Sequence, residues 1–276
     1  DQRLSRGLGD VYKRQRQLGA EIDIVDGYIK AKAKGGLKGG DINFSNVTVT
    51  GTENAIMAGV LAKGTTTISN AAKEPEVVDL VACLRKMGAK IFGEGTDRIE
   101  INGVNALEPC DYSVMADRIE IGTYLTAVTM TKGNVSIKCS LPSVLETILD
   151  KLKIAGANIQ IDEEGINLEM DKIPNPVNIS TAPFPLFPTD MQAQFIALNS
   201  ISNGKSTVIE NVFENRFMHV QELIRMGGNI RLEGNTAYIE GNTKGLIAAP
   251  VMATDLRASA SLVLAGLVAK LSLIHI

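Results

Sequence analysis

Residues that often signal a metal or redox site are scarce in this sequence of 276 residues. The three cysteines, Cys83, Cys110 and Cys139, fall in a predicted helix, loop and strand, and no C-x-x-C spacing joins them. Free thiols in a reducing compartment are the simplest interpretation. Only two histidines occur, His219 and His275, and the second lies in an irregular tail.

Basic charge and long apolar runs are missing as well. The net charge is −3, whereas a general nucleic-acid-binding surface usually carries a strong basic excess. The longest apolar helix pattern covers about twelve residues, and a membrane-spanning helix needs roughly twenty. Residues 1–16 are charged and have no apolar core, so they do not indicate a secretory segment. The composition, 45% hydrophobic and 21% charged, is that of an ordinary globular protein of one or two domains.

A repeat of about seventy residues is the main positive signal. Each unit ends a helix with glycine and a small residue, at Gly19, Gly88, Gly156 and Gly227. Within residues 52–104, polar residues that can cap a helix are followed by a helix, alternating β-branched residues and a second helix that opens with proline. The unit is therefore predicted as helix, strand, helix, strand, strand. The expected caps are Thr52 or Asn54, the helices end at Ala62 and Met87, and the strands lie at 65–69, 90–92 and 98–101.

The two helices of a unit differ in polarity. Residues 77–87 and 144–154 form amphipathic patterns, whereas residues 55–62 and 258–269 are apolar almost all round. A helix without a polar face must be surrounded by protein or lipid. The sequence therefore predicts α/β domains with helices buried at their centres.

The two ends do not follow the repeat. We expect residues 1–15 and 271–276 to be non-native tails on sequence that runs from about Arg16 to Lys270. Recovery of the flanking DNA tests this expectation, because an intact gene with the same ends contradicts it.

Asp190 and Arg216 stand in the first two polar segments that can carry chemistry. Asp190 follows a proline turn at a helix start, where capping is the more common role and a carboxylate aimed at a substrate hydroxyl is the alternative. Arg216 is flanked by Phe213 and Phe217, so packing is expected to direct its guanidinium. His219 stands early in the next predicted helix, where a structural role is more common than a catalytic one.

The other two segments are residues 252–259 and 45–51. Asp255 can cap the most apolar helix, and Arg257 lies at a helix start that favours anions. Arginine binds phosphate or carboxylate through paired hydrogen bonds, and a pair with a neighbouring acid is the alternative. Residues 45–51 form a polar strand-to-helix junction whose backbone groups can bind a flat base, although this signal is weak alone.

Together these segments resemble the UDP-N-acetylglucosamine enolpyruvyl transferases (UDP-N-acetylglucosamine 1-carboxyvinyltransferases). The resemblance covers about residues 16–270, and the matching stretches stand in the family's order. The matching stretches are 74–79, 187–195, 213–220 and 251–266. The resemblance implies two inverse α/β barrels, each of three repeats with buried helices. Residues 16–115 would be the remainder of the first barrel and 116–270 most of the second, with a linker near 109–115 and a substrate cleft between them.

The resemblance also implies a reaction. The enolpyruvyl group of phosphoenolpyruvate passes to the 3′-hydroxyl of UDP-N-acetylglucosamine by addition and elimination, and phosphate is released. It implies a cytoplasmic enzyme of peptidoglycan synthesis, and hence of cell wall biogenesis, cell shape and cell division. No metal or organic cofactor is expected, and the expected partners are these small molecules rather than nucleic acid or membrane.

Site residues follow from the resemblance. Asp190 matches the carboxylate beside the attacking hydroxyl, where it acts as base or orienter. The other matches contact uridine, the sugar and the anionic groups of phosphoenolpyruvate, which need arginine clamps. They are Asn46, Val47, Thr48 and Val49 for uridine, Val212 for the sugar, and Arg216, Asp255 and Arg257 for phosphoenolpyruvate.

Some parts of the family pattern have no match. The amino-terminal repeats with the catalytic-cysteine loop and a carboxyl-terminal arginine segment are absent, and none of the three cysteines has that loop's context. We therefore expect negligible turnover from this polypeptide alone, and poor solubility or association because central helices are partly exposed. Phosphate release at the rate of a full-length relative contradicts the first expectation, and a sharp two-state monomeric melt contradicts the second.

Three alternatives remain at this point. The nearest is the sister enzyme that transfers the same group to shikimate 3-phosphate. The second is a non-catalytic nucleotide-sugar-binding relative built on the same repeats. A clamp-like nucleic-acid ring is the third, and the acidic charge balance disfavours it.

Overall fold

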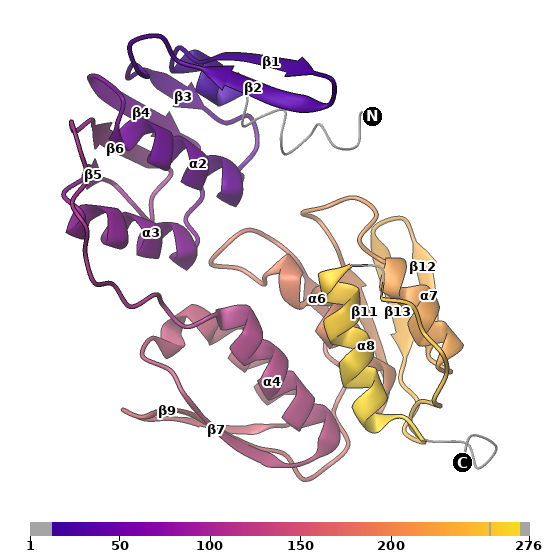
Figure 1. The fold of residues 1–276 in the computed structure, drawn as a ribbon. Helices are drawn as coiled ribbons and strands as arrows, with labels where there is room; N and C mark the ends of the chain where they lie inside the picture. The colour runs from indigo at the N-terminus through magenta and orange to yellow at the C-terminus, as the bar shows by residue number, and fades with distance from the viewer. Residues whose placement is uncertain (1–12, 254, 271–276) are drawn as a thin grey trace. The chain divides into compact units, whose positions relative to one another are not determined.

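The computed structural model describes residues 13–253 and 255–270 of the chain. The chain forms two compact units, Asp1–Met115 and Ala116–Ile276, and each is described by itself (Figure 1). Residues 1–12 and 271–276 of the predicted tails, His275 among them, lie outside the described residues, as does Thr254. Within the described chain, no helix is both long enough and apolar enough to cross a membrane.

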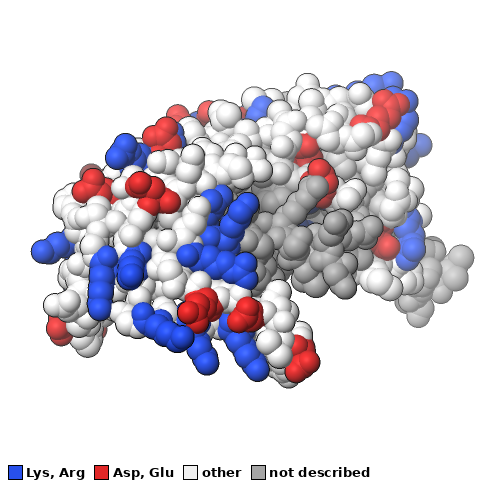
Figure 2. All heavy atoms as spheres, turned by 90° about the horizontal axis from the view of Figure 1, so that it is seen from above, with Lys and Arg blue, Asp and Glu red and all other residues white. Residues whose placement is uncertain are grey.

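After a helical segment at residues 13–17, unit 1 has an antiparallel hairpin of β1 (Glu21–Val25) and β2 (Tyr28–Lys32). Its two-residue turn has positive φ angles at Asp26 (53°) and Gly27 (79°), which suits the Asp-Gly pair of a tight hairpin. On the face shown in Figure 2, lysine and arginine side chains lie beside aspartate and glutamate side chains.

One repeat follows in unit 1. A four-stranded sheet has the order β3 (Asp41–Asn43), β4 (Thr65–Ser69), β6 (Arg98–Asn102) and β5 (Lys90–Phe92), in which only β3 and β4 run parallel. α2 (Val49–Val60) and α3 (Pro75–Lys86) pack against it (Figure 1). The strands bury alternate residues, as half-buried strands do, and Ile68, Ile91 and Ile99 point into the core. The predicted order of helix, strand, helix, strand, strand is confirmed.

The predicted start of α2 was wrong. Thr48, rather than Thr52 or Asn54, is the cap, and its Oγ1 accepts from the backbone N–H of Gly51 at 3.3 Å. Gly51 fits the first turn because a Cβ there would come within 3.0 Å of the Phe44 ring. The junction proposed at residues 45–51 is therefore partly helical.

Unit 2 contains two further copies of the repeat. The first has α4 (Arg118–Thr131), β7 (Asn134–Lys138), η1 (Pro142–Leu145), α5 (Glu146–Ala155), β8 (Asn158–Ile161) and β9 (Gly165–Glu169). The second has β10 (Ile179–Ser180), η2 (Thr189–Met191), α6 (Gln192–Ser200), β11 (Lys205–Ile209), α7 (Met218–Arg225), β12 (Asn229–Glu233) and β13 (Thr236–Glu240), and α8 (Leu256–Val268) follows. Cys139 lies just after β7 rather than within a strand.

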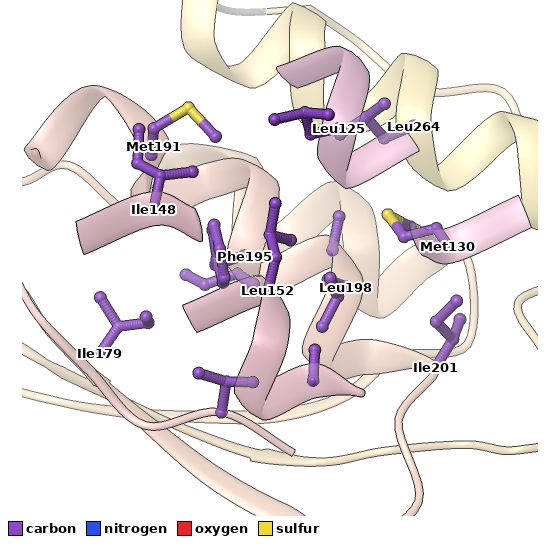
Figure 3. Packing of buried hydrophobic residues seen from close by; sticks show 14 of the residues in the cluster. Leu125, Met130, Ile148, Leu152, Ile179, Met191, Phe195, Leu198, Ile201 and Leu264 are labelled. Carbon is purple, nitrogen blue, oxygen red and sulfur yellow. The ribbon is translucent and has the colours of Figure 1, made fainter. Parts of the chain in front are cut away.

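The core of unit 2 lies where α4, α6 and α8 pack together, with the sheets β7-β9-β8 and β10-β11-β13-β12 around them (Figure 1). Figure 3 shows Phe195 and Leu198 of α6 among Leu125 of α4, Leu152 of α5 and Leu264 of α8. All nine residues of α6 are buried. α6 therefore lies inside, with the strands outside it, and the described sheets do not close into a barrel.

The apolar helices are not covered all round. α8 buries Leu262, Leu264 and Ala265 but leaves Val263 65% and Leu267 59% exposed. The prediction of helices buried on every side is thus wrong for α8, and the companion expectation of partly exposed central helices is confirmed. The fully enclosed helix is α6, whose sequence is less apolar than that of α8.

Candidate active site

Three charged side chains from separate elements of unit 2 meet at one carboxylate oxygen. Asp190 lies in η2 at the entry to α6, Arg216 lies in the loop between β11 and α7, and Arg257 lies in the first turn of α8. Nε of Arg257 donates to Oδ1 of Asp190 at 2.5 Å. Nη1 of Arg216 lies 3.1 Å from the same oxygen. The structure therefore brings together three residues that the resemblance assigns to the substrate site.

The two arginines favour the ionised form of the Asp190 carboxyl group. Partial burial raises the pKa of this carboxyl group, but the hydrogen bond and charge of Arg257, with those of Arg216, outweigh burial and bring the pKa below its usual value. Asp190 makes no capping hydrogen bond to α6. The capping interpretation was therefore wrong for this residue, and its carboxylate faces cations instead.

Arg216 borders a hollow. Its guanidinium carbon lies 4.2 Å from the centre of the Phe213 ring, and its Nη1 donates to Oγ1 of Thr189 at 2.5 Å. Phe217 is half-buried against the core. The open hollow of about 830 Å³ is lined by residues 210–218, Leu232, Gly234 and Asn235. Packing and hydrogen bonds thus fix the guanidinium at the edge of a space that can admit a ligand.

Asp255 and Val212 have backbone roles. Oδ1 of Asp255 accepts from the backbone N–H of Arg257 at 2.9 Å, so the predicted cap of α8 is confirmed. The N–H of Val212 donates to Oε1 of Glu210 at 2.9 Å, which places Val212 in the lining of the hollow. Asp255 thereby fixes the helix start that carries Arg257.

The predicted uridine segment belongs to unit 1. Asn46 and Val47 are exposed, while Thr48 caps α2 and Val49 is its first residue. The polar segment thus presents side chains and backbone to solvent beside a helix N-terminus, an arrangement that can bind a ligand through main-chain groups.

His219 is a buried, neutral residue. Only 2% of its surface is exposed, and its Nε2 has no hydrogen-bond partner in the described part of the chain. Burial lowers the pKa of His219 to about 4, although the charge of Asp255 opposes the shift. A structural role fits these surroundings.

Replacement of His219 by glutamine should flatten the acid dependence of stability. Because the folded-state pKa of about 4 lies below the ordinary value of 6.5, the unfolded chain takes up this proton first. The contribution of neutral His219 to the free energy of unfolding is therefore fully present above pH 6.5. It is lost as the pH drops toward 4, by roughly 3 kcal/mol. Urea unfolding at pH 7 and pH 4.5 measures the loss, which should be smaller in His219→Gln. Equal losses in both proteins would contradict the assignment.

Two residues that support the site escaped prediction. Thr189 lies in the matching stretch 187–195 but received no role of its own, and Glu210 was not singled out, because a glutamate after a strand is usually exposed. Glu210 is only 3% exposed, and its carboxylate accepts from Thr189. No sequence signal separates this glutamate from a solvated one. Among the described residues, no group of three or more histidine, cysteine, aspartate or glutamate residues is placed to hold a metal.

Comparison with known proteins assigns the family. The protein-family model described as EPSP synthase (3-phosphoshikimate 1-carboxyvinyltransferase) matches residues 2–275 of this chain. The chain belongs to this family of enolpyruvyl transferases. A UDP-N-acetylglucosamine 1-carboxyvinyltransferase from Saccharophagus degradans is 58% identical over 254 residues, which cover 92% of this chain and 60% of that relative.

Solved structures of enolpyruvyl transferases share the fold. NikO from Streptomyces tendae has a TM-score of 0.82 at 22% identity, over 95% of this chain and 65% of that one. EPSP synthase from Acinetobacter baumannii has a TM-score of 0.67 at 18% identity, over 96% of this chain and 65% of that one. The chain therefore has the enolpyruvyl transferase fold, and it spans less than two thirds of these relatives.

Proposed function

We propose that this chain carries part of the active site of an enzyme that transfers the enolpyruvyl group of phosphoenolpyruvate to the 3′-hydroxyl of UDP-N-acetylglucosamine. The observation that carries the proposal is the meeting of Arg216 and Arg257 at the carboxylate of Asp190. The relative with 58% identity bears the name of this activity. A cytoplasmic role in peptidoglycan synthesis follows from that activity as part of the proposal.

The roles follow from charge. The two arginines bind the anionic groups of phosphoenolpyruvate, and Asp190 takes the proton from the attacking hydroxyl or orients it. Their contacts with Asp190 hold the pKa of this carboxyl group down. An anion that takes over these arginines removes that influence, so Asp190 becomes a stronger base when the donor substrate is bound.

The remaining assignments are proposals of the same kind. Asp255 fixes the start of α8, and Val212 contacts the sugar from the lining of the hollow. Residues 46–49 contact uridine through the exposed lead into α2. Residues 16–115 belong to the first barrel and 116–270 to the second.

Calorimetry with the 276-residue chain should distinguish the two acceptor substrates. We expect UDP-N-acetylglucosamine to bind at least about tenfold more tightly than shikimate 3-phosphate, because only the first offers a nucleotide to residues 46–49. UMP is the matched ligand for this segment and should compete with the nucleotide sugar. Preference for shikimate 3-phosphate would support the sister activity instead. Nucleotide-sugar binding without any affinity for phosphoenolpyruvate would support a non-catalytic binding protein.

A further inference from the structure

Glu210 is a buried carboxylate with four hydrogen-bond donors around it. Oε1 accepts from the backbone N–H groups of Val212 (2.9 Å) and Phe213 (3.0 Å) and from the hydroxyl of Thr181 (3.0 Å). Oε2 accepts from the hydroxyl of Thr189 at 2.8 Å. A carboxylate can accept all four of these hydrogen bonds, so they offset the cost of burying the Glu210 side chain. Glu210 therefore fixes the loop that leads to Arg216 on one side and the residue before Asp190 on the other.

The direction of the Thr189 hydrogen bond matters for Arg216. A threonine hydroxyl has one proton and two lone pairs. Because Glu210 can only accept when ionised, the proton of Thr189 points to Glu210, and the lone pairs remain for other donors. Nη1 of Arg216 donates to this oxygen at 2.5 Å and lies 3.1 Å from Oδ1 of Asp190.

We propose that Glu210 is a positioning residue of the anion site, because it sets the Thr189 hydroxyl as the acceptor that holds the guanidinium of Arg216. This inference deepens the proposed function and relies on it for the identity of the anion. Glu210 lies behind Thr189 and acts on the ligand through that hydroxyl and Arg216. The ring of Phe213, 4.2 Å from the guanidinium carbon, supports the guanidinium from another side.

A glutamine at position 210 tests the direction of the hydrogen bond. The two backbone N–H groups of Val212 and Phe213 require an acceptor, so the amide oxygen must face them. The amide NH₂ then faces Thr189 and donates to it, which releases the Thr189 proton. The released proton then shares the two remaining positions of the Thr189 oxygen with one lone pair, so Arg216 keeps this acceptor only while the proton points away from it.

The test uses inorganic phosphate as the probe and the 276-residue chain as the protein. Thr189→Val removes the hydroxyl but keeps the shape, and we expect the phosphate affinity to fall about tenfold. Thr189→Ser keeps the hydroxyl and should stay within about twofold of the unaltered chain. Glu210→Gln should also lower the affinity, by no more than Thr189→Val does, and the double variant should lose no more than Thr189→Val alone. Additive losses would show that Glu210 does not act through Thr189 and would overturn the proposal.

Thr181→Val is the matched control. Thr181 is also buried and also donates to Glu210, but no contact joins its hydroxyl to Arg216. It should lower the unfolding midpoint and leave the phosphate affinity unchanged. A fall in affinity equal to that of Thr189→Val would mean that Glu210 only stabilises the fold, which contradicts a positioning role.

A second measurement needs no ligand. NMR of the arginine side chains reports how fast the guanidinium of Arg216 rotates, and rotation should quicken in Thr189→Val and Glu210→Gln but not in Thr181→Val. Unchanged rotation in the first two variants overturns the proposal. Failure of the unaltered chain to bind phosphate, with the rotation result as expected, would instead count against the proposed function alone.

Discussion

Truncation of Phe195 to alanine should lower the free energy of unfolding by about 3–5 kcal/mol, because it opens a cavity at the centre of unit 2. Phe195 has no exposed surface, and its ring meets that of Phe187 edge to face, with centroids 5.1 Å apart. Such an aromatic pair adds roughly 0.5–1.5 kcal/mol to the burial itself. Chemical denaturation of the variant and the unaltered chain measures the difference.

Tyr124 provides the matched control for this prediction. It is an aromatic residue on α4 of the same unit, but it is 57% exposed. Tyr124→Ala should change the unfolding free energy by less than about 0.5–1 kcal/mol. A loss below about 1 kcal/mol for Phe195→Ala would contradict the placement of α6 at the core.

The repeat and several strands could be predicted because their signals are local. The alternation of β-branched residues gives the bounds of β4. Gly88, with a φ of 99°, ends α3 as expected. The start of α2 could not be predicted, because Val49 and Gly51 are poor helix formers, and only the fold shows that the neighbouring Thr48 and Phe44 side chains leave no room for a Cβ at position 51.

The burial of α6 could not be predicted either. Gln194 and Asn199 give its sequence a polar character, yet both are buried. The Nε2 of Gln194 donates to Thr123 at 3.0 Å, and Asn199 exchanges hydrogen bonds of 2.9 Å with the backbone of Val177. These partners are distant in sequence, so periodicity alone does not reveal the hydrogen bonds that hold these two side chains inside the protein, where Oε1 of Gln194 still has no partner among the described residues.

The candidate site could also be predicted only in part. Asp190, Arg216 and Arg257 could be selected from their residue types at helix starts and from the family resemblance. Their distances depend on three elements that pack together, which no local pattern records. Glu210 was missed because its burial, rather than its residue type, makes it relevant.

Substitutions of Arg216 and of Asp190 should change the affinity for inorganic phosphate in opposite directions. Arg216→Met removes one cation of the site, and we expect the affinity to fall about thirtyfold, because the Arg216 side chain is itself largely buried and hydrogen-bonded. Asp190→Asn removes the carboxylate that both arginines now contact, so the anion no longer competes with it. The affinity should then rise about tenfold, although the substitution removes the proposed base. Isothermal titration at constant pH and ionic strength measures both changes.

Arg225 is the control arginine, because it also contacts an acid, Glu222 at 3.3 Å, but lies in the last turn of α7 and is largely exposed. Arg225→Met should leave the phosphate affinity within about twofold, since Arg225 does not line the hollow beside Arg216 and makes no contact with Asp190. A fall in affinity in Asp190→Asn would mean that Asp190 organises the arginines for the anion rather than occupying their place. The opposite signs therefore decide whether Asp190 competes with the anion of the donor substrate for the two arginines.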